Sequence, residues 1–215
     1  MNQVAKKETA GLPAEVMFEE DAGKGIGKVG QEDLALPFLK VLVQLSPQVN
    51  KRDGKYVEGA EPGMIFNSVT GELYDGVKGI DVIPALYKLE YVEWKDRGEG
   101  PGAPVMVHHA SSDIMSSTKP DASYRDRLPN GNYIEKTASH FVMITGDTPS
   151  TALISMTRTQ LKISRKWNSM ISGIKLKGKN GLYTPSSYSH IYKLKTVPMS
   201  NDKGNWFGWE VSKLG

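Results

Sequence analysis

Residues 79–95 read GIDVIPALYKLEYVEWK, and this stretch decides the fold. It is long and rich in Val, Ile, Tyr and Trp, the residue types that favour β-strands. In its second half apolar and charged residues alternate, which is typical of a strand with one face toward a core and one toward water. The stretch therefore predicts one long β-strand, and the runs on either side are interpreted around it.

Several neighbouring runs also have the composition of strands, and turn signals separate them. A compact apolar segment, DLALPFLKVLVQLSP, precedes them and contains Pro47 near its end. HFVMITG and TALISMT predict two strands about a turn, and the last two runs predict a closing hairpin around Asn201-Asp202-Lys203-Gly204. The expected strands lie at residues 63–67, 69–74 (a turn into a strand), 140–146, 151–157, 186–200 and 205–215.

One stretch has no regular pattern, and one later stretch has the period of a helix. Residues 96–138 are polar and irregular apart from LPNGNYI, whose Asn-Gly pair predicts a tight hairpin, so we interpret them as an insertion. In the helical stretch, apolar residues fall on one face and basic residues on the opposite side. Gly173 is expected to end this helix. Its apolar face comprises Met156, Ile163, Trp167, Met170, Ile171 and Ile174.

Many strands, one late helix and a closing hairpin predict a mainly β fold of the β-rich α+β class. We expect an OB-like small barrel with one amphipathic helix late in the chain and a long insertion. Residues 1–31 contain few apolar residues and predict a flexible N-terminal arm, so the domain is expected to span residues 32–215. A β-sandwich is the alternative arrangement of the same strands.

Charge is distributed unevenly along the chain. The net charge is +3, yet residues 148–201 contain nine Lys or Arg and no Asp or Glu, so the remaining residues carry a net −6. A surface of one sign attracts polyanions over a long range and costs self-repulsion while nothing is bound. A solvated basic face is the alternative interpretation. The nine cations are Arg158, Lys162, Arg165, Lys166, Lys175, Lys177, Lys179, Lys193 and Lys195.

Aromatic residues are interleaved with these cations. Binders of single-stranded nucleic acid need both, because Lys and Arg follow the phosphates while flat rings stack on unpaired bases. Trp167 lies on the apolar helix face and is expected in the core. The spacing of Tyr188 and Tyr192 places both on one face of an expected strand. Besides the nine cations, the expected nucleic-acid-binding residues are Tyr183, Tyr188, Tyr192 and Trp206.

The sequence lacks the signatures of the common catalytic and metal sites. It has no cysteine, no H-E-x-x-H, no G-x-S-x-G and no G-x-x-x-x-G-K-[ST]. His108 and His109 point to opposite faces of a strand and make a poor chelate. No run approaches eighteen apolar residues, so no membrane partner is expected. We therefore expect a protein that is not an enzyme and that uses no cofactor or metal.

Two stretches of the chain resemble a group of phage-encoded proteins. They are residues 36–94 (LPFLKVLVQLSPQV…YVEGAEPGMIFNSVTGELYDG…YVEW) and residues 157–215 (TQLKISRKWNSM…YTPSSYSHIYKL…DKGNWFGWEVSKLG). These proteins are generally regarded as single-stranded DNA-binding replication proteins. The resemblance implies an OB-type core and a role in coating DNA during phage replication or recombination. Proteins of this function commonly end in an acidic tail, whereas this chain ends at Lys213-Leu214-Gly215.

Charge and resemblance together predict a sequence-independent single-stranded DNA-binding protein in the host cytoplasm. The expected partners are single-stranded DNA, phage replication or recombination proteins, and further copies of the chain. Two alternatives stay open. One is a phage interaction or virion-associated protein whose basic face binds a protein partner or packaged DNA. The other is an enzyme whose site assembles from distant residues.

Overall fold

The computed structural model describes residues 33–100, 102–202 and 204–214. The chain divides into two units after Ala35, and the second unit is the one described below. The predicted arm at residues 1–31 lies outside the described residues.

The predicted long strand is confirmed as β4 (Ile80–Trp94), which lies at the centre of an eight-stranded antiparallel sheet. One edge of β4 pairs with β12 near its start and with β5 near its end, and its other edge pairs with β8. β8 in turn pairs with β7 and β9. The strands of this sheet are β4, β5 (Met106–His109), β6 (Lys119–Pro120), β7 (Asp126–Arg127), β8 (Tyr133–Ile144), β9 (Ser150–Thr157), β12 (Tyr192–Asn201) and β13 (Gly204–Lys213).

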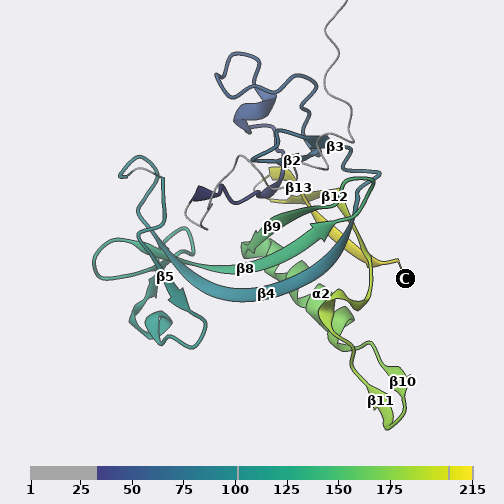
Figure 1. Cartoon of the computed structure of the whole chain (residues 1–215). Coiled ribbons are helices and arrows are strands. Elements are labelled where there is room, and N and C mark those ends of the chain that lie inside the picture. Colours follow the sequence, from purple (N-terminus) through teal and green to yellow (C-terminus); the bar gives the residue numbers. More distant parts are fainter. Residues whose placement is uncertain (1–32, 101, 203, 215) are drawn as a thin grey trace, which may run out of the picture. The chain divides into compact units, whose positions relative to one another are not determined.

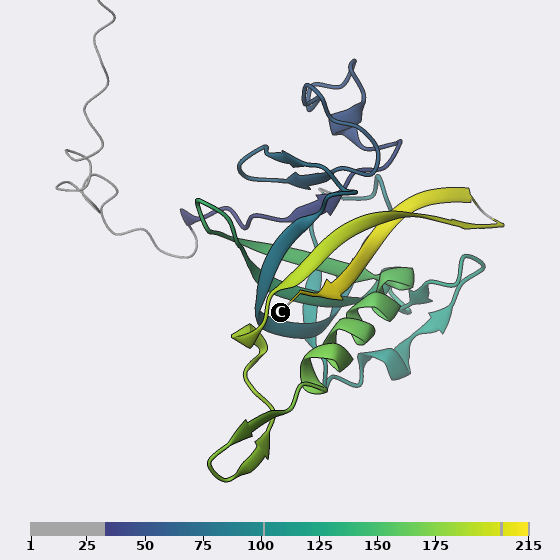
Figure 2. The same ribbon diagram turned by 90° about the vertical axis from the view of Figure 1, so that its right-hand side faces the viewer.

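A bulge in β4 bends this sheet. The pairing with β8 shifts between Pro84 and Leu86, so Ala85 has no partner opposite it. Proline has no N–H to give to a ladder and is found in sheets at edges and bulges, and a bulge increases the local twist and bend. Figures 1 and 2 show the sheet curling around α2 (Leu161–Ser172), and the structure confirms a mainly β fold with a curled half-barrel sheet and one late helix.

The core forms where α2 lies against the concave side of the half-barrel. The Trp167 ring is fully buried and stacks on the His140 ring, with centroids 4.5 Å apart and planes 17° apart. The ring of Tyr192, the first residue of β12, also lies beside Trp167, and the two ring centroids are 5.9 Å apart. The His140 Nε2 and the Ser164 Oγ are hydrogen-bonded at 2.8 Å, whereas the buried Trp167 Nε1 and the Tyr192 hydroxyl have no hydrogen-bond partner among the described residues. Trp167 is therefore core, as its place on the apolar helix face predicts.

A second, smaller sheet packs beside the first. It contains β1 (Leu39–Val41), β2 (Ile65–Asn67) and β3 (Leu73–Tyr74), and its side chains share a small core of Leu42, Ala60 and Phe66. The short strand and the turn into another strand expected here are confirmed. The 3₁₀ turn η2 (Pro47–Val49) follows β1.

Strand β12 ties this small sheet to the large one. The Thr196 N–H donates to the Gly76 carbonyl at 2.9 Å, and the Thr196 hydroxyl donates to the Gly63 carbonyl. A Cβ on Gly76 would lie 1.9 Å from the Gly63 carbonyl oxygen, so the backbones approach as closely as only glycine allows.

The insertion is shorter than predicted. It contains β5, η3 (Ile114–Ser117), β6 and β7, and the Asn-Gly hairpin is confirmed because the Leu128 N–H donates to the Asn132 carbonyl at 2.8 Å. Its expected end at residue 138 is wrong, since the residues from Tyr133 onward belong to β8 and pair along β4. The polar run Glu135-Lys136-Thr137 conceals this strand in the sequence, although Ile134 before it and Ala138 after it are buried.

Ionic and hydrogen-bonded side chains hold the insertion together. Arg127 contacts both Asp96 and Asp121, at 3.0 and 2.9 Å, and Arg125 contacts the same two carboxylates. The buried Glu93 carboxylate accepts hydrogen bonds from the Asn132 and Asn130 side chains at 2.6 and 3.1 Å. The bond from Asn132 is the main cause of the lowered pKa of Glu93.

The end of the chain differs from the predictions in detail. Met156 lies in β9 and Ile174 follows α2, so neither belongs to the helix, which ends before Gly173 as expected. The closing hairpin is confirmed, with Asn201 opposite Gly204. Its first strand begins at Tyr192 rather than at residue 186. The remaining short elements are η4 (Arg158–Gln160), β10 (Leu176–Gly178), β11 (Gly181–Tyr183) and η5 (Ser187–Ser189). No helix in the described part of the chain is long and apolar enough to cross a membrane.

Burial of His140 makes stability depend on pH. Desolvation lowers its pKa from 6.5 to about 4, so between these values the unfolded chain binds a proton that the folded chain excludes. Stability is then highest above pH 6.5 and falls as the pH drops toward 4. We expect a loss of about 2 kcal/mol between pH 7 and pH 5 in the free energy of unfolding, measured by urea denaturation.

The variant His140→Phe keeps a ring against Trp167 and removes the titration, so its stability should change far less over the same range. His109→Ala, at an exposed histidine, is the control and should keep the full pH dependence. Equal slopes for His140→Phe and the parent protein would contradict the assignment to His140.

Candidate nucleic-acid interface

The structure sorts the nine cations of the acid-free segment by the element that carries them. Helix α2 carries Lys162, Arg165 and Lys166, and the hairpin of β10 and β11 carries the lysines at 177 and 179, with Lys175 at its base. The other three, Arg158, Lys193 and Lys195, lie on η4 and β12. These two sets have different surroundings.

The basic side of α2 is exposed because the helix buries its opposite side. Trp167 and Ser164 face the core, which turns Lys162, Arg165 and Lys166 toward solvent. None of these three has an ion-pair partner in the part of the chain that the structure describes. The first turn of α2 has no acidic residue, and Gln160 before it makes no capping hydrogen bond, so the positive end of the helix dipole lies beside Lys162. This arrangement costs some helix stability and leaves α2 itself without a negative charge.

The β10–β11 hairpin continues this surface beyond the end of α2 (Figures 1 and 2). Lys177 lies opposite Leu182 in the register, and the Lys175 ammonium donates to the Thr184 hydroxyl. Because side chains alternate along a strand, Lys177 lies on the face opposite to Leu176, and Lys175 and Lys179 flank this strand at its two ends.

The opposite face of the hairpin carries a tyrosine. Tyr183 lies opposite Leu176, and a Cβ built on Gly178 would lie 3.1 Å from the Tyr183 ring, so the ring covers this glycine. Tyr183 is 50% exposed. Tyr188, in η5, is 65% exposed, and Ser187 beside it donates to the Ala85 carbonyl in the β4 bulge at 3.4 Å. Both rings are therefore accessible to a stacking partner.

Tyr192 is a correction to the prediction. Its ring is fully buried beside Trp167, and burial raises the pKa of its hydroxyl. It is the first residue of β12 and lies opposite Val82 of β4, whereas Tyr188 belongs to a 3₁₀ turn, so the two do not share a strand face. Tyr192 is part of the core and cannot stack on a base in this fold.

Three of the predicted cations face acids from other parts of the chain. Lys193 forms an ion pair with Asp81 of the neighbouring strand, and Arg158 donates from Nε to the Glu135 Oε1 at 2.8 Å. Lys195 lies opposite Glu210 in the β12–β13 register. A charge count along one segment misses such neighbours, because adjacent strands come from distant parts of the sequence.

Trp206 is half-buried near the free end of the closing hairpin. It lines a hollow of about 530 Å³ together with Phe207, Met199 and Val43. The hollow lies at the β12–β13 hairpin and the loop after β1, and none of the exposed cations of α2 or the β10–β11 hairpin lines it. The structure thus does not bring Trp206 together with the basic surface.

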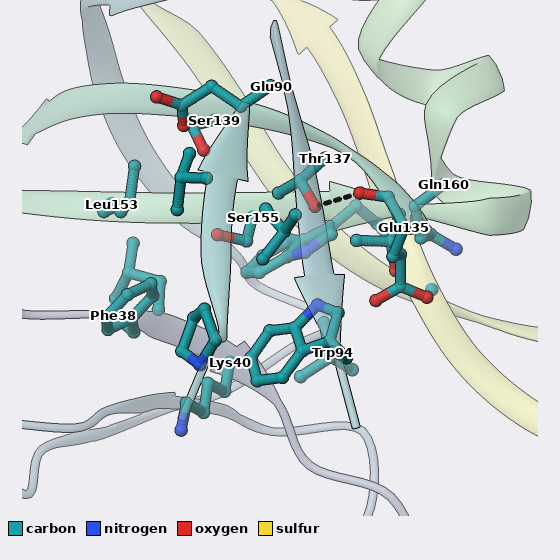
Figure 3. A pocket seen from close by; sticks show the side chains of 18 of the residues that line it. Phe38, Lys40, Glu90, Trp94, Glu135, Thr137, Ser139, Leu153, Ser155 and Gln160 are labelled. Carbon is teal, nitrogen blue, oxygen red and sulfur yellow. Dashed lines mark hydrogen bonds between the residues drawn. The ribbon is translucent and has the colours of Figure 1, made fainter. Parts of the chain in front are cut away.

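Sequence reasoning missed a larger hollow of about 680 Å³, which Figure 3 shows. Ser139 of β8 lines it, whereas the next residue, His140, faces α2, so the hollow lies on the side of the sheet away from the helix. Phe38 and Lys40 form one part of its wall, and Trp94 forms another part. We call it the aromatic hollow; its lining also includes Glu90, Thr137, Ser155, Gln160, Glu135, Phe207 and Trp209.

The aromatic hollow is not suited to phosphate. Two carboxylates, Glu90 and Glu135, line it beside a single lysine, and most of its surface is apolar. It suits a ring or an apolar chain with a few polar groups. No group of three or more His, Cys, Asp or Glu residues able to hold a metal ion occurs in the described ranges.

Comparison with known proteins relates the chain to a family of phage proteins. None of the curated proteins and none of the solved structures compared with the chain matches it. A family described as Pam3 phage gp34-like protein matches residues 5–215, which include all the elements described above. The chain therefore belongs to the Pam3 phage gp34-like protein family.

Proposed function

We propose that this protein binds single-stranded DNA without sequence preference. The observation that carries the proposal is the set of exposed cations on α2 and around the β10–β11 hairpin, for which no ion pair to a carboxylate occurs in the described part of the chain. Each phosphate of DNA is an anion, and lysines that neutralise phosphates release condensed counterions, which favours binding.

Exposed tyrosine rings favour single-stranded DNA over duplex DNA as the ligand. Tyr183 and Tyr188 lie exposed within the same part of the chain as the free cations. Bases in a single strand have free faces for stacking, and one stacked base contributes about 1–3 kcal/mol. Every base has such a face, so this mode of binding tolerates any sequence.

The family supports a role during phage infection. Single strands arise when phage DNA is replicated or recombined, and a protein that coats them acts in the host cytoplasm beside the replication or recombination proteins. The curled sheet supports an OB-type core, because the OB-fold is itself a small, strongly curved barrel. Folds of this type bind oligonucleotides. No catalytic step enters this proposal.

Salt dependence tests the electrostatic part. If about five phosphates are neutralised, the logarithm of the affinity for oligo-dT should fall with the logarithm of salt concentration with a slope near −3.5. Replacing Lys175, Lys177 and Lys179 by Ala together should weaken binding equally for all sequences and make the slope shallower by about 2 units. Anisotropy of a labelled strand at several salt concentrations measures both quantities.

A matched control removes the same charge elsewhere. Lys51, Lys55 and Lys119 are exposed and lie far from residues 148–201 in the sequence, so their triple Ala variant should keep the parent slope. A parent slope of zero would contradict DNA binding by this surface. If duplex DNA competes as well as oligo-dT, the alternative of a packaged-DNA or virion-associated protein is favoured instead.

Tyr188 and Tyr192, which were expected to share one strand face, should respond differently to replacement by Ala. Tyr188→Ala removes an exposed ring, so it should weaken oligo-dT binding about tenfold, leave the salt slope unchanged and keep the melting temperature. Tyr192→Ala empties part of the core and should lower stability by about 3–5 kcal/mol, as large-to-small aromatic substitutions in cores do. Binding titrations and urea denaturation of both variants check this; a folded, stable Tyr192→Ala protein would refute the core assignment.

A further inference from the structure

The β10–β11 hairpin stands apart from the rest of the fold. In the described part of the chain, no hydrogen bond, ion pair or ring contact joins residues 176–183 to any residue outside the hairpin. Figures 1 and 2 both show it projecting away from the sheet. An isolated two-stranded hairpin is marginally stable in water, so a structure of this kind gains its order from what it binds.

Its apolar side chains are exposed and lack cover. Leu182 is 74% exposed, Leu176 is 36% exposed and Tyr183 is 50% exposed. Each face of this small element thus carries large apolar side chains that are open to solvent, Leu182 on one face and Leu176 with Tyr183 on the other. Something is therefore expected to cover them.

The two faces of the hairpin differ in chemistry. One face carries Lys177 with Leu182, with Lys175 and Lys179 at the two ends of β10, and the other face carries Leu176 and the Tyr183 ring lying over Gly178. No acidic residue lies among residues 148–201, so an acidic or phosphate-bearing partner fits the first face without repulsion. A flat ring on the second face fits a base pair or a base.

One occupant satisfies both faces at once. At the junction between duplex and single strand, the last base pair exposes a flat face while the departing strand presents a row of phosphates. Two-stranded ribbons enter DNA grooves, and apolar side chains on DNA-binding proteins insert against base steps. A protein partner with an acidic surface would also cover Leu182 and meet Lys177, and the experiment below distinguishes it from DNA.

We propose that the β10–β11 hairpin recognises junctions between duplex and single-stranded DNA, with Tyr183 against the terminal base pair and Lys177 and Lys179 on the phosphates of the departing strand. This inference rests on the proposed function and adds a preferred place of binding to it. The protein binds the junction and does not separate the two strands of the duplex, since the proposal includes no source of energy for strand separation.

The experiment compares three labelled probes: oligo-dT, a blunt duplex, and a fork that joins this duplex to oligo-dT arms. The parent protein should bind the fork about tenfold more tightly than oligo-dT, the contribution of one stacked pair. Tyr183→Ala should reduce fork binding to the level of oligo-dT. A 2-aminopurine base at the terminal pair should change its fluorescence on binding, and the same base inside the duplex should not.

Tyr124→Ala is the matched control, because Tyr124 is an exposed tyrosine outside residues 148–201 and its removal should leave the preference for the fork intact. Replacement of residues 175–184 by a short Gly-Ser turn is the second variant, and it should abolish the preference without loss of the fold. Since no hydrogen bond, ion pair or ring contact joins residues 176–183 to the rest of the described chain, circular dichroism should show the parent sheet.

The outcomes separate the two proposals. If the parent protein binds neither oligo-dT nor the fork, the proposed function fails. If it binds oligo-dT with a steep salt dependence but binds the fork no better, only the junction proposal fails. If the Gly-Ser variant binds every probe as the parent protein does, the junction proposal is overturned, and the hairpin lysines are also excluded from the surface that binds oligo-dT.

Discussion

The structure depends on the stack that Trp167 makes with His140 inside the half-barrel. This contact fixes the rotation of α2 about its own axis, because the Trp167 ring lies between the β8 histidine and Tyr192 of β12. Once the rotation is fixed, Lys162, Arg165 and Lys166 can only face solvent. The charged surface is thus a consequence of aromatic packing, and the hydrogen bond between the His140 Nε2 and the Ser164 Oγ holds the histidine ring in its place in the stack.

The bend in β4 is the second requirement. A flat sheet would leave α2 lying on one side with much of Trp167 in water, whereas the curl at Ala85 wraps strands around the helix. The same bulge carbonyl accepts a hydrogen bond from Ser187 and so holds the chain that leads from the β10–β11 hairpin to β12. One irregular residue therefore both shapes the core and positions the segment that carries Tyr188.

The sequence predicts well those features that have a local period. The long strand at residues 80–94, the two strands around Asp147, the amphipathic helix and the closing hairpin all have local signals, and all are present. Features that depend on distant partners are not predictable in this way. Tyr192 becomes core because it lies opposite Val82, and Lys193 is neutralised because it lies beside Asp81. The aromatic hollow collects residues from six strands, from Phe38 to Trp209, and no local pattern marks them as neighbours.

The order of strands in the main sheet has a consequence for synthesis. β4 ends at Trp94, yet one of its partners, β12, begins only at Tyr192, so nearly half of the chain is made between the two. While the ribosome adds these residues, one edge of the first part of β4 has no partner from its own chain, and exposed edges invite pairing with other chains. Contacts between distant residues also slow folding. During its own synthesis, the nascent protein is therefore at greatest risk of aggregation just before β12 and β13 complete the sheet.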